Sequence, residues 1–254
     1  MSITHDGQTR VLPAPELGVC RFVPGRGDVW TFRDDAAWLR AKAPGGPLAG
    51  ILGASEYPTE CLMSYKADDT PDSLLAKRQE GRERRAGLRG PIEDTLSMRL
   101  GLWCEPFLFA EYARARPDRG CEIAAGKIVF VDPTGNLLAT PDGWCWDLDR
   151  PEIRWPLQVK MYSEFYRSRF ASQKKANKGE RSIPDFLLGQ CGVEALCCGT
   201  TRASYFALCG NRDPYQDDLD FGPDFAASAL EVGRVFKQAV DELIGRKSED
   251  CISG

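Results

Sequence analysis

The spacing of apolar residues changes from a helical period to a two-residue period near the middle of the chain. From Ile92 to Ala115, apolar side chains recur every three or four positions, which predicts a helix that ends before Pro117. Four runs with strand character follow, "KIVFVD", "LLAT", "WCWDL" and "IRWPLQVK", separated by the turn sequences "PTGN", "PDG" and "DRPE". We therefore expect a series of antiparallel strands directly after the long helix.

Shorter elements are predicted on both sides of this core. They are helices at residues 34–43 and 58–67, a basic helical stretch within 167–181, a helix at 184–198, a strand at 203–210 and a helix at 223–244. This order predicts an α/β fold, with a central mixed sheet flanked by helices. We expect an irregular N-terminal segment (1–25), one domain (26–246) and a C-terminal tail (247–254).

Composition narrows the class of protein. The chain has 254 residues, 43% hydrophobic and 28% charged, which is ordinary for a globular protein. It shows no export signal and no apolar run of membrane-spanning length, so we expect a cytoplasmic protein without a membrane partner. The single histidine, His5, disfavours a histidine-based zinc site and a Ser-His-Asp triad.

Ten cysteines without a CxxC pair suit reduced thiols in a cytosol. Four of them lie in apolar surroundings and are expected to be small buried hydrophobes: Cys191, Cys197, Cys198 and Cys209. An iron–sulfur cluster is the alternative, but the cysteine spacing does not match one.

The net charge of −4 argues weakly against a nucleic-acid partner, but the basic residues are concentrated. Residues 77–89 hold six basic and two acidic side chains, and residues 167–181 hold six basic and one acidic. Each run alone is most simply a solvated helix face. Together they suggest a phosphate-binding wall, in which Lys174, Lys175 and Lys178 contact DNA.

A set of oxygen-bearing side chains and one lysine is expected to converge: Glu105, Asp132, Asp142, Gln158 and Lys160. Gln158 and Lys160 are two positions apart on a strand, so both point to one face. If the flanking runs form one hairpin, Asp142 and Gln158 meet at its end. Clustered carboxylates suit Mg²⁺, and a nearby lysine can neutralise a phosphate. Taken singly, "PDG" and "DPTG" are ordinary turns, so only the joint order carries this inference.

These motifs resemble the lambda-exonuclease and YqaJ-like viral recombinase family of the PD-(D/E)XK nuclease superfamily. The resemblance runs from about Trp38 to Leu243 and rests on "GILGASEY", "MRLGLWCEPFLFAEY", "VDPTGNLLATPDGW", "QVK" and "PDFLLGQCGVEALCCGTTRASYFALCGNRD". It implies a restriction-endonuclease-like core, and "QVK" stands where the family has E-x-K. Gln158 keeps only a carbonyl oxygen at the carboxylate position.

Carried over by position, the resemblance implies a role for each site residue. Glu105, Asp132, Asp142 and Gln158 become metal ligands for Mg²⁺, with Mn²⁺ as a substitute. Lys160 becomes the catalytic lysine, assisted by Asp142 and Gln158, and Gln190 becomes the helix residue that supports the site. Ser55 and Thr140 fall where a terminal 5′-phosphate is recognised, and Arg40 or Lys42 stands in for the expected basic residue.

The resemblance favours a 5′→3′ exonuclease on double-stranded DNA, used in phage-type recombination in a bacterial host or phage-infected cell. It also implies a ring-shaped homo-oligomer and a single-strand annealing protein as partner. The glutamine at position 158 keeps a second interpretation open, a catalytically impaired nuclease fold that binds DNA or another protein. A structure-specific endonuclease of the same superfamily is the third.

Overall fold

The computed structural model describes residues 2–5, 8–11, 17–23, 26–63, 69–90, 92–93, 95–179, 182–210 and 213–252. Its strands are β1 (Ser2–His5), β2 (Gln8–Val11), β3 (Gly18–Val23), β4 (Gly27–Phe32), β5 (Leu52–Gly53), β6 (Arg119–Ile123), β7 (Ile128–Val131), β8 (Leu137–Ala139), β9 (Gly143–Asp147), β10 (Arg154–Tyr162), β11 (Arg202–Cys209) and β12 (Tyr215–Asp220). Its helices are α1 (Asp35–Lys42), α2 (Tyr57–Glu60), α3 (Pro71–Arg85), α4 (Leu96–Ala115), the 3₁₀ helix η1 (Glu164–Tyr166), α5 (Arg167–Ala176), α6 (Asp185–Cys197) and α7 (Pro223–Ile252).

The strands form two mixed five-stranded sheets and a small β1–β2 hairpin. One large sheet has the order β12-β11-β10-β9-β6, and the other has the order β3-β4-β7-β8-β5. Neighbouring strands are antiparallel except for the parallel pairs β10–β11 and β5–β8. The predicted α/β class with a mixed sheet is confirmed, although the sheet is divided in two.

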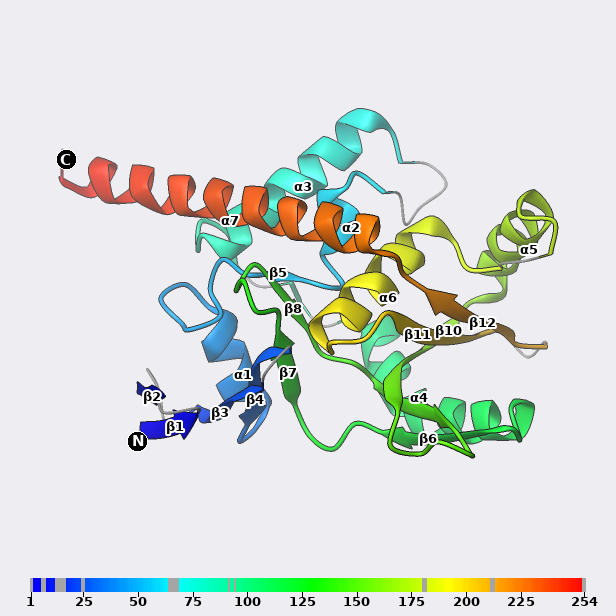
Figure 1. Ribbon diagram of the computed structural model, residues 1–254. Helices are drawn as coiled ribbons and strands as arrows, with labels where there is room; N and C mark the ends of the chain where they lie inside the picture. The colour runs from blue at the N-terminus through cyan, green and yellow to red at the C-terminus, as the bar shows by residue number, and fades with distance from the viewer. Residues whose placement is uncertain are drawn as a thin grey trace.

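Helices α4 and α6 cover opposite faces of the first sheet. Leu108 and Tyr112 of α4 pack with Leu157 and Val159 of β10. Helix α6 packs instead on the other face, against alternate residues of β11 that begin at Ala203. Helix α6 also contacts β8 of the second sheet. Helix α7 packs on this second sheet as well, as Figure 1 shows. Helix α6 therefore lies between the two sheets.

Local sequence explains where several helices begin. Asp34 caps α1, because its Oδ1 accepts a hydrogen bond from the amide of Ala37 at 2.7 Å. Thr95 caps α4 in the same way, through the amide of Met98 at 3.2 Å. Within the described ranges, no helix combines the length and apolar character needed to cross a membrane.

The structure corrects several predictions about secondary structure, among them the C-terminal tail at 247–254, because α7 continues to Ile252. Residues 1–25 are not irregular throughout, because β1, β2 and β3 lie among them. The helix expected at 58–67 ends early within the described residues, since α2 ends at Glu60, and positions 64–67 lie outside them. Strands β6 and β12 were not predicted, because neither has an alternating apolar pattern. The four cysteines expected to be buried hydrophobes are buried, which confirms that prediction.

Candidate active site

A cleft of about 470 Å³ is lined by residues of both large sheets and of α1, α4 and α6. The predicted site residues that line it are Ser55, Glu105, Thr140, Asp142, Lys160 and Gln190. They come from positions 55 to 190, so the fold assembles the site from distant segments.

Asp142 lies at the centre of this cleft because of the β9–β10 hairpin. Leu157 pairs with Gly143, which places Gln158 beside Asp142. The Asp142 Oδ2 atom accepts hydrogen bonds from the Val159 amide at 3.1 Å, from Lys160 Nζ at 3.0 Å and from the amide nitrogen of Gln158. The prediction that Asp142 and Gln158 meet at the hairpin end is confirmed.

Gly143 allows this hairpin to pass close to α4. A Cβ atom at this position would lie 2.3 Å from the ring of Phe109 and equally close to the carbonyl oxygen of Glu122. Only glycine fits such a contact, so α4 can approach the strand that follows Asp142. Glu105, one turn before Phe109 on α4, lines the same cleft.

Strand alternation turns Gln158 and Lys160 toward α6. Their neighbours Leu157 and Val159 belong to the core on the α4 face. Gln158 and Lys160 both contact Asp142, so they share the opposite face, as predicted. Gln158 is only 1% exposed, and within the described chain its Oε1 atom is buried without a hydrogen-bond partner.

The structure adds Glu194, a carboxylate that the sequence analysis did not select. Glu194 lines the cleft from α6, is 1% exposed, and accepts a hydrogen bond at Oε1 from Gln190 Nε2 at 3.0 Å. A signal was present in the sequence, since Gln190 and Glu194 are polar residues four apart in a helix that is apolar elsewhere after Asp185.

Burial and the charge of Asp142 raise the pKa values of the two glutamates of the cleft. Burial, and then the charge of Asp142, raise the pKa of Glu194 to about 8. The same two causes raise the pKa of Glu105 above its usual range. Burial alone would lower the pKa of Lys160, but the charge of Asp142, aided by Tyr162 and Glu194, holds it above the ordinary lysine value. Lys160 is therefore a cation at neutral pH.

Asp132, predicted as a metal ligand, is not among the residues that line the cleft. It is 2% exposed, and its carboxylate accepts hydrogen bonds from the backbone amides of Thr134, Asn136 and Leu137 at 2.6 to 2.8 Å. The Thr134 hydroxyl donates to it as well. These contacts stabilise the β7–β8 turn, so the turn interpretation of "DPTG" fits Asp132 better than the ligand interpretation.

Only some of the residues predicted to recognise a terminal phosphate line the cleft. Ser55 and Thr140 line the cleft, but Arg40 is exposed and does not. Lys42, its alternative, does line the cleft, with Nζ 4.8 Å from the ring centre of Trp38. Burial, and then the charge of Arg85, lower the pKa of Lys42 to about 8. The Trp38 indole nitrogen is buried and, in the described chain, has no hydrogen-bond partner.

The described residues of the two basic runs do not line the cleft. In residues 77–89, on and after α3, five of the basic side chains form ion pairs with acidic residues. The pairs are Lys77–Asp69, Arg82–Glu60, Arg84–Glu80, Arg85–Glu56 and Arg89–Glu83. Lys174, Lys175 and Lys178 are exposed in and just after α5, which projects from one end of the molecule in Figure 1.

The donors of the cleft fit a hard cation, although they are not arranged around one. Among the described residues, no group of three or more acidic, cysteine or histidine side chains lies in ligand geometry. The cleft is nevertheless lined by the carboxylates of Glu105, Asp142 and Glu194, and the buried Oε2 atom of Glu194 has no hydrogen-bond partner among the described residues. Mg²⁺ prefers oxygen ligands of this type, so these residues fit the metal that the resemblance implies.

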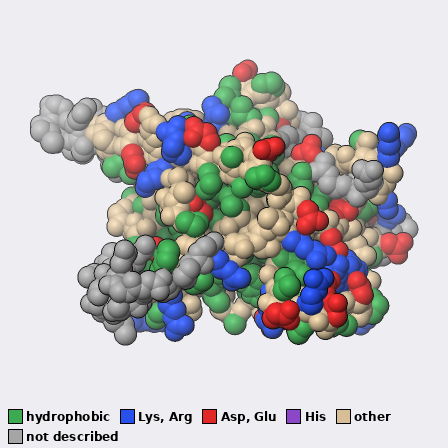
Figure 2. All heavy atoms as spheres, in the orientation of Figure 1, with side chains coloured by type: hydrophobic (Ala, Val, Ile, Leu, Met, Phe, Trp, Pro, Cys, Tyr) green, Lys and Arg blue, Asp and Glu red, His purple; other side chains and the backbone are tan. Residues whose placement is uncertain are grey.

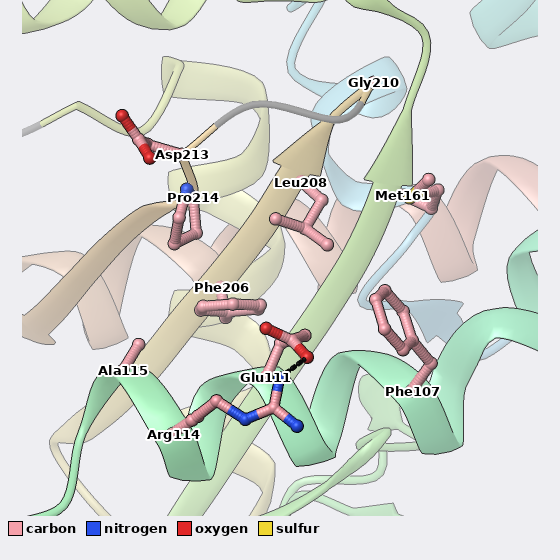
Figure 3. Close-up of a pocket in the computed structure, with 10 residues that line it drawn as sticks. All are labelled: Phe107, Glu111, Arg114, Ala115, Met161, Phe206, Leu208, Gly210, Asp213 and Pro214. Carbon is pink, nitrogen blue, oxygen red and sulfur yellow. Dashed lines mark hydrogen bonds and ion pairs between the residues drawn. The ribbon is translucent and has the colours of Figure 1, made fainter.

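A second hollow, on the other side of Met161, is larger, but its lining is mainly apolar. This apolar groove of about 670 Å³ lies between α4 and the strands β10 and β11, and Figure 3 shows its lining. Two of its charged residues, Glu111 and Arg114, pair with each other. Its remaining lining is mainly apolar, with Phe107, Phe206 and Leu208. The groove therefore lacks the converging polar groups that mark the cleft as the active-site candidate.

The fold is similar to those of solved exonucleases. An alkaline exonuclease from Laribacter hongkongensis, LHK-Exo, is 15% identical with a TM-score of 0.58, and the match covers 82% of this chain and 96% of that one. Its complex with dAMP gives 14% identity, a TM-score of 0.60 and the same coverage. A phage-related exonuclease from Haemophilus somnus 129PT is 9% identical with a TM-score of 0.55, and the match covers 78% of this chain and 96% of that one. No protein-family model and no curated protein matches the sequence. At such identities the likeness establishes the fold, which is of the nuclease kind that the resemblance implies.

Proposed function

We propose that this protein is a Mg²⁺-dependent deoxyribonuclease that degrades double-stranded DNA from its ends in the 5′→3′ direction. The observation that carries the proposal is the cleft, where Glu105, Asp142 and Lys160 converge on a fold shared with exonucleases. Carboxylates beside a lysine in a concave site are typical of phosphodiester hydrolysis with a metal ion.

Each residue of the cleft has a distinct part in this chemistry. Mg²⁺, or Mn²⁺ in its place, would be held by oxygens of Glu105 and Asp142 and would stabilise negative charge on the scissile phosphate. Lys160 donates hydrogen bonds to a phosphate oxygen and neutralises its charge, and its raised pKa prevents it from acting as a base. The Val159 amide and Lys160 keep the Asp142 carboxylate in a fixed orientation.

The proposed substrate end is a 5′-phosphate bound by Ser55, Thr140 and Lys42, which line the same cleft as Asp142. Hydroxyl groups and a lysine are suitable donors to a phosphate. One exonuclease of similar fold was crystallised with dAMP, which supports deoxynucleoside monophosphates as the products here. A role in phage-type recombination, an annealing partner and a ring-shaped oligomer stay predictions from the resemblance.

One observation favours a second candidate, a nuclease fold that binds DNA without cutting it. The amide nitrogen of Gln158 donates a hydrogen bond to Asp142 Oδ2. In an E-x-K motif, the carboxylate at this position would instead bind a cation together with Asp142. If a carboxylate at position 158 is indispensable, the site with Gln158 cannot hold a metal ion tightly enough for catalysis.

Linear and circular duplex DNA separate these candidates. With Mg²⁺, the proposed enzyme shortens linear DNA, releases a 5′-terminal label before a 3′-terminal one, and leaves circles intact. Cleavage of circles would indicate an endonuclease. Retention of linear DNA in a gel-shift assay without cleavage, in Mg²⁺ and in Mn²⁺, would establish the binding protein.

A further inference from the structure

We propose that Glu194 of α6 supplies the carboxylate that position 158 lacks, so that the metal site is completed from the helix and not from the strand. The inference rests on the proposed function, because it concerns the same cleft. It assigns a ligand role to a residue outside the segment from Asp142 to the Q-x-K of Gln158 and Lys160.

The first support is position. Helix α6 packs on the face of β10 to which Gln158 and Lys160 point, and it contacts that strand. Glu194 lines the cleft together with Asp142 and Lys160. A carboxylate of α6 thus lines the same cleft as Asp142 and Lys160.

The second support is the unpaired oxygen. Glu194 is 1% exposed, and in the described part of the chain its Oε2 atom is buried without a hydrogen-bond partner. A buried carboxylate oxygen without a partner destabilises the fold. The neighbours Val193 and Ala195 are apolar and fully buried, so packing of α6 does not require an acid here. A bound cation would provide the missing partner.

The third support is the orientation imposed by Gln190. Its Nε2 donates to Oε1 of Glu194 from one turn earlier on the same helix, at 3.0 Å. This contact uses one carboxylate oxygen and leaves the other, Oε2, for a ligand. Gln190 thereby acts as a positioning residue for Glu194, which gives physical content to the supporting role that the resemblance implies.

Calorimetric titration with Mn²⁺ in the absence of DNA tests the assignment independently of cleavage. Four proteins are compared: wild type, Glu194→Gln, Gln158→Glu, and the double variant that moves the carboxylate from residue 194 to residue 158. Glu194→Gln should weaken Mn²⁺ binding at least about tenfold, since a charged ligand is lost. The double variant should recover affinity to within about threefold of wild type, because the carboxylate count is restored.

Matched variants separate a ligand from a structural residue. Asp185→Asn removes the other carboxylate of α6, at its exposed first turn, and should leave Mn²⁺ affinity unchanged. Glu194→Gln keeps the shape of the side chain and removes a buried ionisable group, so the metal-free protein should melt at the same or a higher temperature. Glu194→Asp keeps the charge on a shorter stem, and its Mn²⁺ affinity should fall between those of wild type and Glu194→Gln.

The outcomes distinguish this inference from the proposed function. If wild type binds Mn²⁺ and Glu194→Gln binds it equally well, Glu194 is not a ligand although the nuclease proposal stands. A double variant that binds no better than Glu194→Gln would also overturn the inference. If wild type binds neither Mn²⁺ nor Mg²⁺, the metal-dependent function fails first, and this inference fails with it.

Discussion

Two charged clusters lie on the same five-stranded sheet, and they differ in how completely they are neutralised. The arginine cluster, at one end, combines Asp147 and Asp218 with Arg116, Arg119 and Arg202. Figure 2 shows basic and acidic side chains intermixed at the end of the molecule where β6 lies. In the cleft, by contrast, Glu105, Asp142 and Glu194 line the same space as Lys160, which pairs with Asp142, and among the described residues Glu194 Oε2 is buried without a hydrogen-bond partner.

In the arginine cluster, the acidic and basic side chains pair with one another. Each carboxylate is held by at least two guanidinium groups, with Arg119 at 3.0 Å from Asp218 and Arg202 at 3.3 Å from Asp147. The guanidinium group of Arg202 also stacks 3.9 Å from the ring centre of Trp155. Both oxygens of Asp147 and both oxygens of Asp218 accept hydrogen bonds in this network, so its contribution is to stability. The cleft has surplus negative charge, which a cation or a proton must balance.

The largest expected effect separates the two clusters by activity. Asp142→Ala should lower the rate of DNA cleavage at least about 10³-fold, because it removes the carboxylate at the centre of the cleft. DNA binding should survive, since repulsion between this carboxylate and phosphate is also removed. The matched change in the arginine cluster, Asp218→Asn, should leave the cleavage rate within about twofold. Quantitative release of labelled nucleotides measures both. Equal losses in the two variants would show that the cleft is not the catalytic site.

The second prediction concerns stability, for which the larger effect is expected from a change in the arginine cluster. Burial alone would raise the pKa of Asp218, but the hydrogen bond from Ser204 and the charges of Arg116 and Arg119 hold this pKa below its usual value. A carboxyl group with a lowered folded-state pKa stabilises the fold above its unfolded-state pKa, and the contribution is lost as the pH falls through the folded-state value. Asp218→Asn should therefore lower the free energy of unfolding by roughly 1–3 kcal/mol at pH 7.

Urea denaturation at two pH values tests this sign. At pH 7 the wild type should be more stable than Asp218→Asn, and the difference should shrink as the pH is lowered through the acid range below 3.8, the ordinary aspartate value. A difference that stays constant with pH would mean that Asp218 acts through packing and not through its charge.

The contrast between the clusters also explains what the sequence could and could not predict. Asp142 and Gln158 were placed together because a local turn, "PDG", joins two alternating strands, so their contact follows from hairpin register. The arginine cluster was not predicted, because it joins residues between 116 and 218 through β6 and β12, which lack a strand pattern. These strands are stabilised by pairing with β9 and β11, which is a tertiary effect.

Two site predictions depend on contacts that the sequence does not record. "DPTG" satisfies both a turn and a nuclease motif, and only the hydrogen bonds of Asp132 show that the turn interpretation fits better. The basic run at 77–89 was interpreted by its net charge, but acidic residues elsewhere in the fold neutralise most of it, such as Glu56 and Glu60. Sequence composition records charges and does not record which of them are paired.

The third prediction tests whether the cleft also recognises the DNA end. A 5′-phosphorylated duplex should be degraded about tenfold faster than a 5′-hydroxyl duplex, since Lys42 forms a charge-assisted hydrogen bond to the phosphate. Lys42→Met should remove this preference, and Arg40→Met should retain it, because Arg40 is exposed outside the cleft. With a pKa of about 8, Lys42 is charged below that pH, so the preference should decline in more alkaline buffer. Equal rates on both ends in the wild type would reject terminal-phosphate recognition.

The smallest expected effect concerns DNA that extends beyond the cleft. Lys174, Lys175 and Lys178 are exposed in and just after α5, away from the cleft, so only a duplex long enough to extend past the cleft can reach them. Each phosphate contact contributes about 0.9 to the slope of log affinity against log salt concentration. Replacing all three lysines by Met should flatten this slope by one to two units, about one or two contacts, for a duplex of roughly 30 base pairs. For a duplex of roughly 10 base pairs, the slope should not change. An unchanged slope for the longer duplex would remove α5 from the DNA path. A slope that flattens equally for both lengths would instead place these lysines close to the cleft, against the positions seen here.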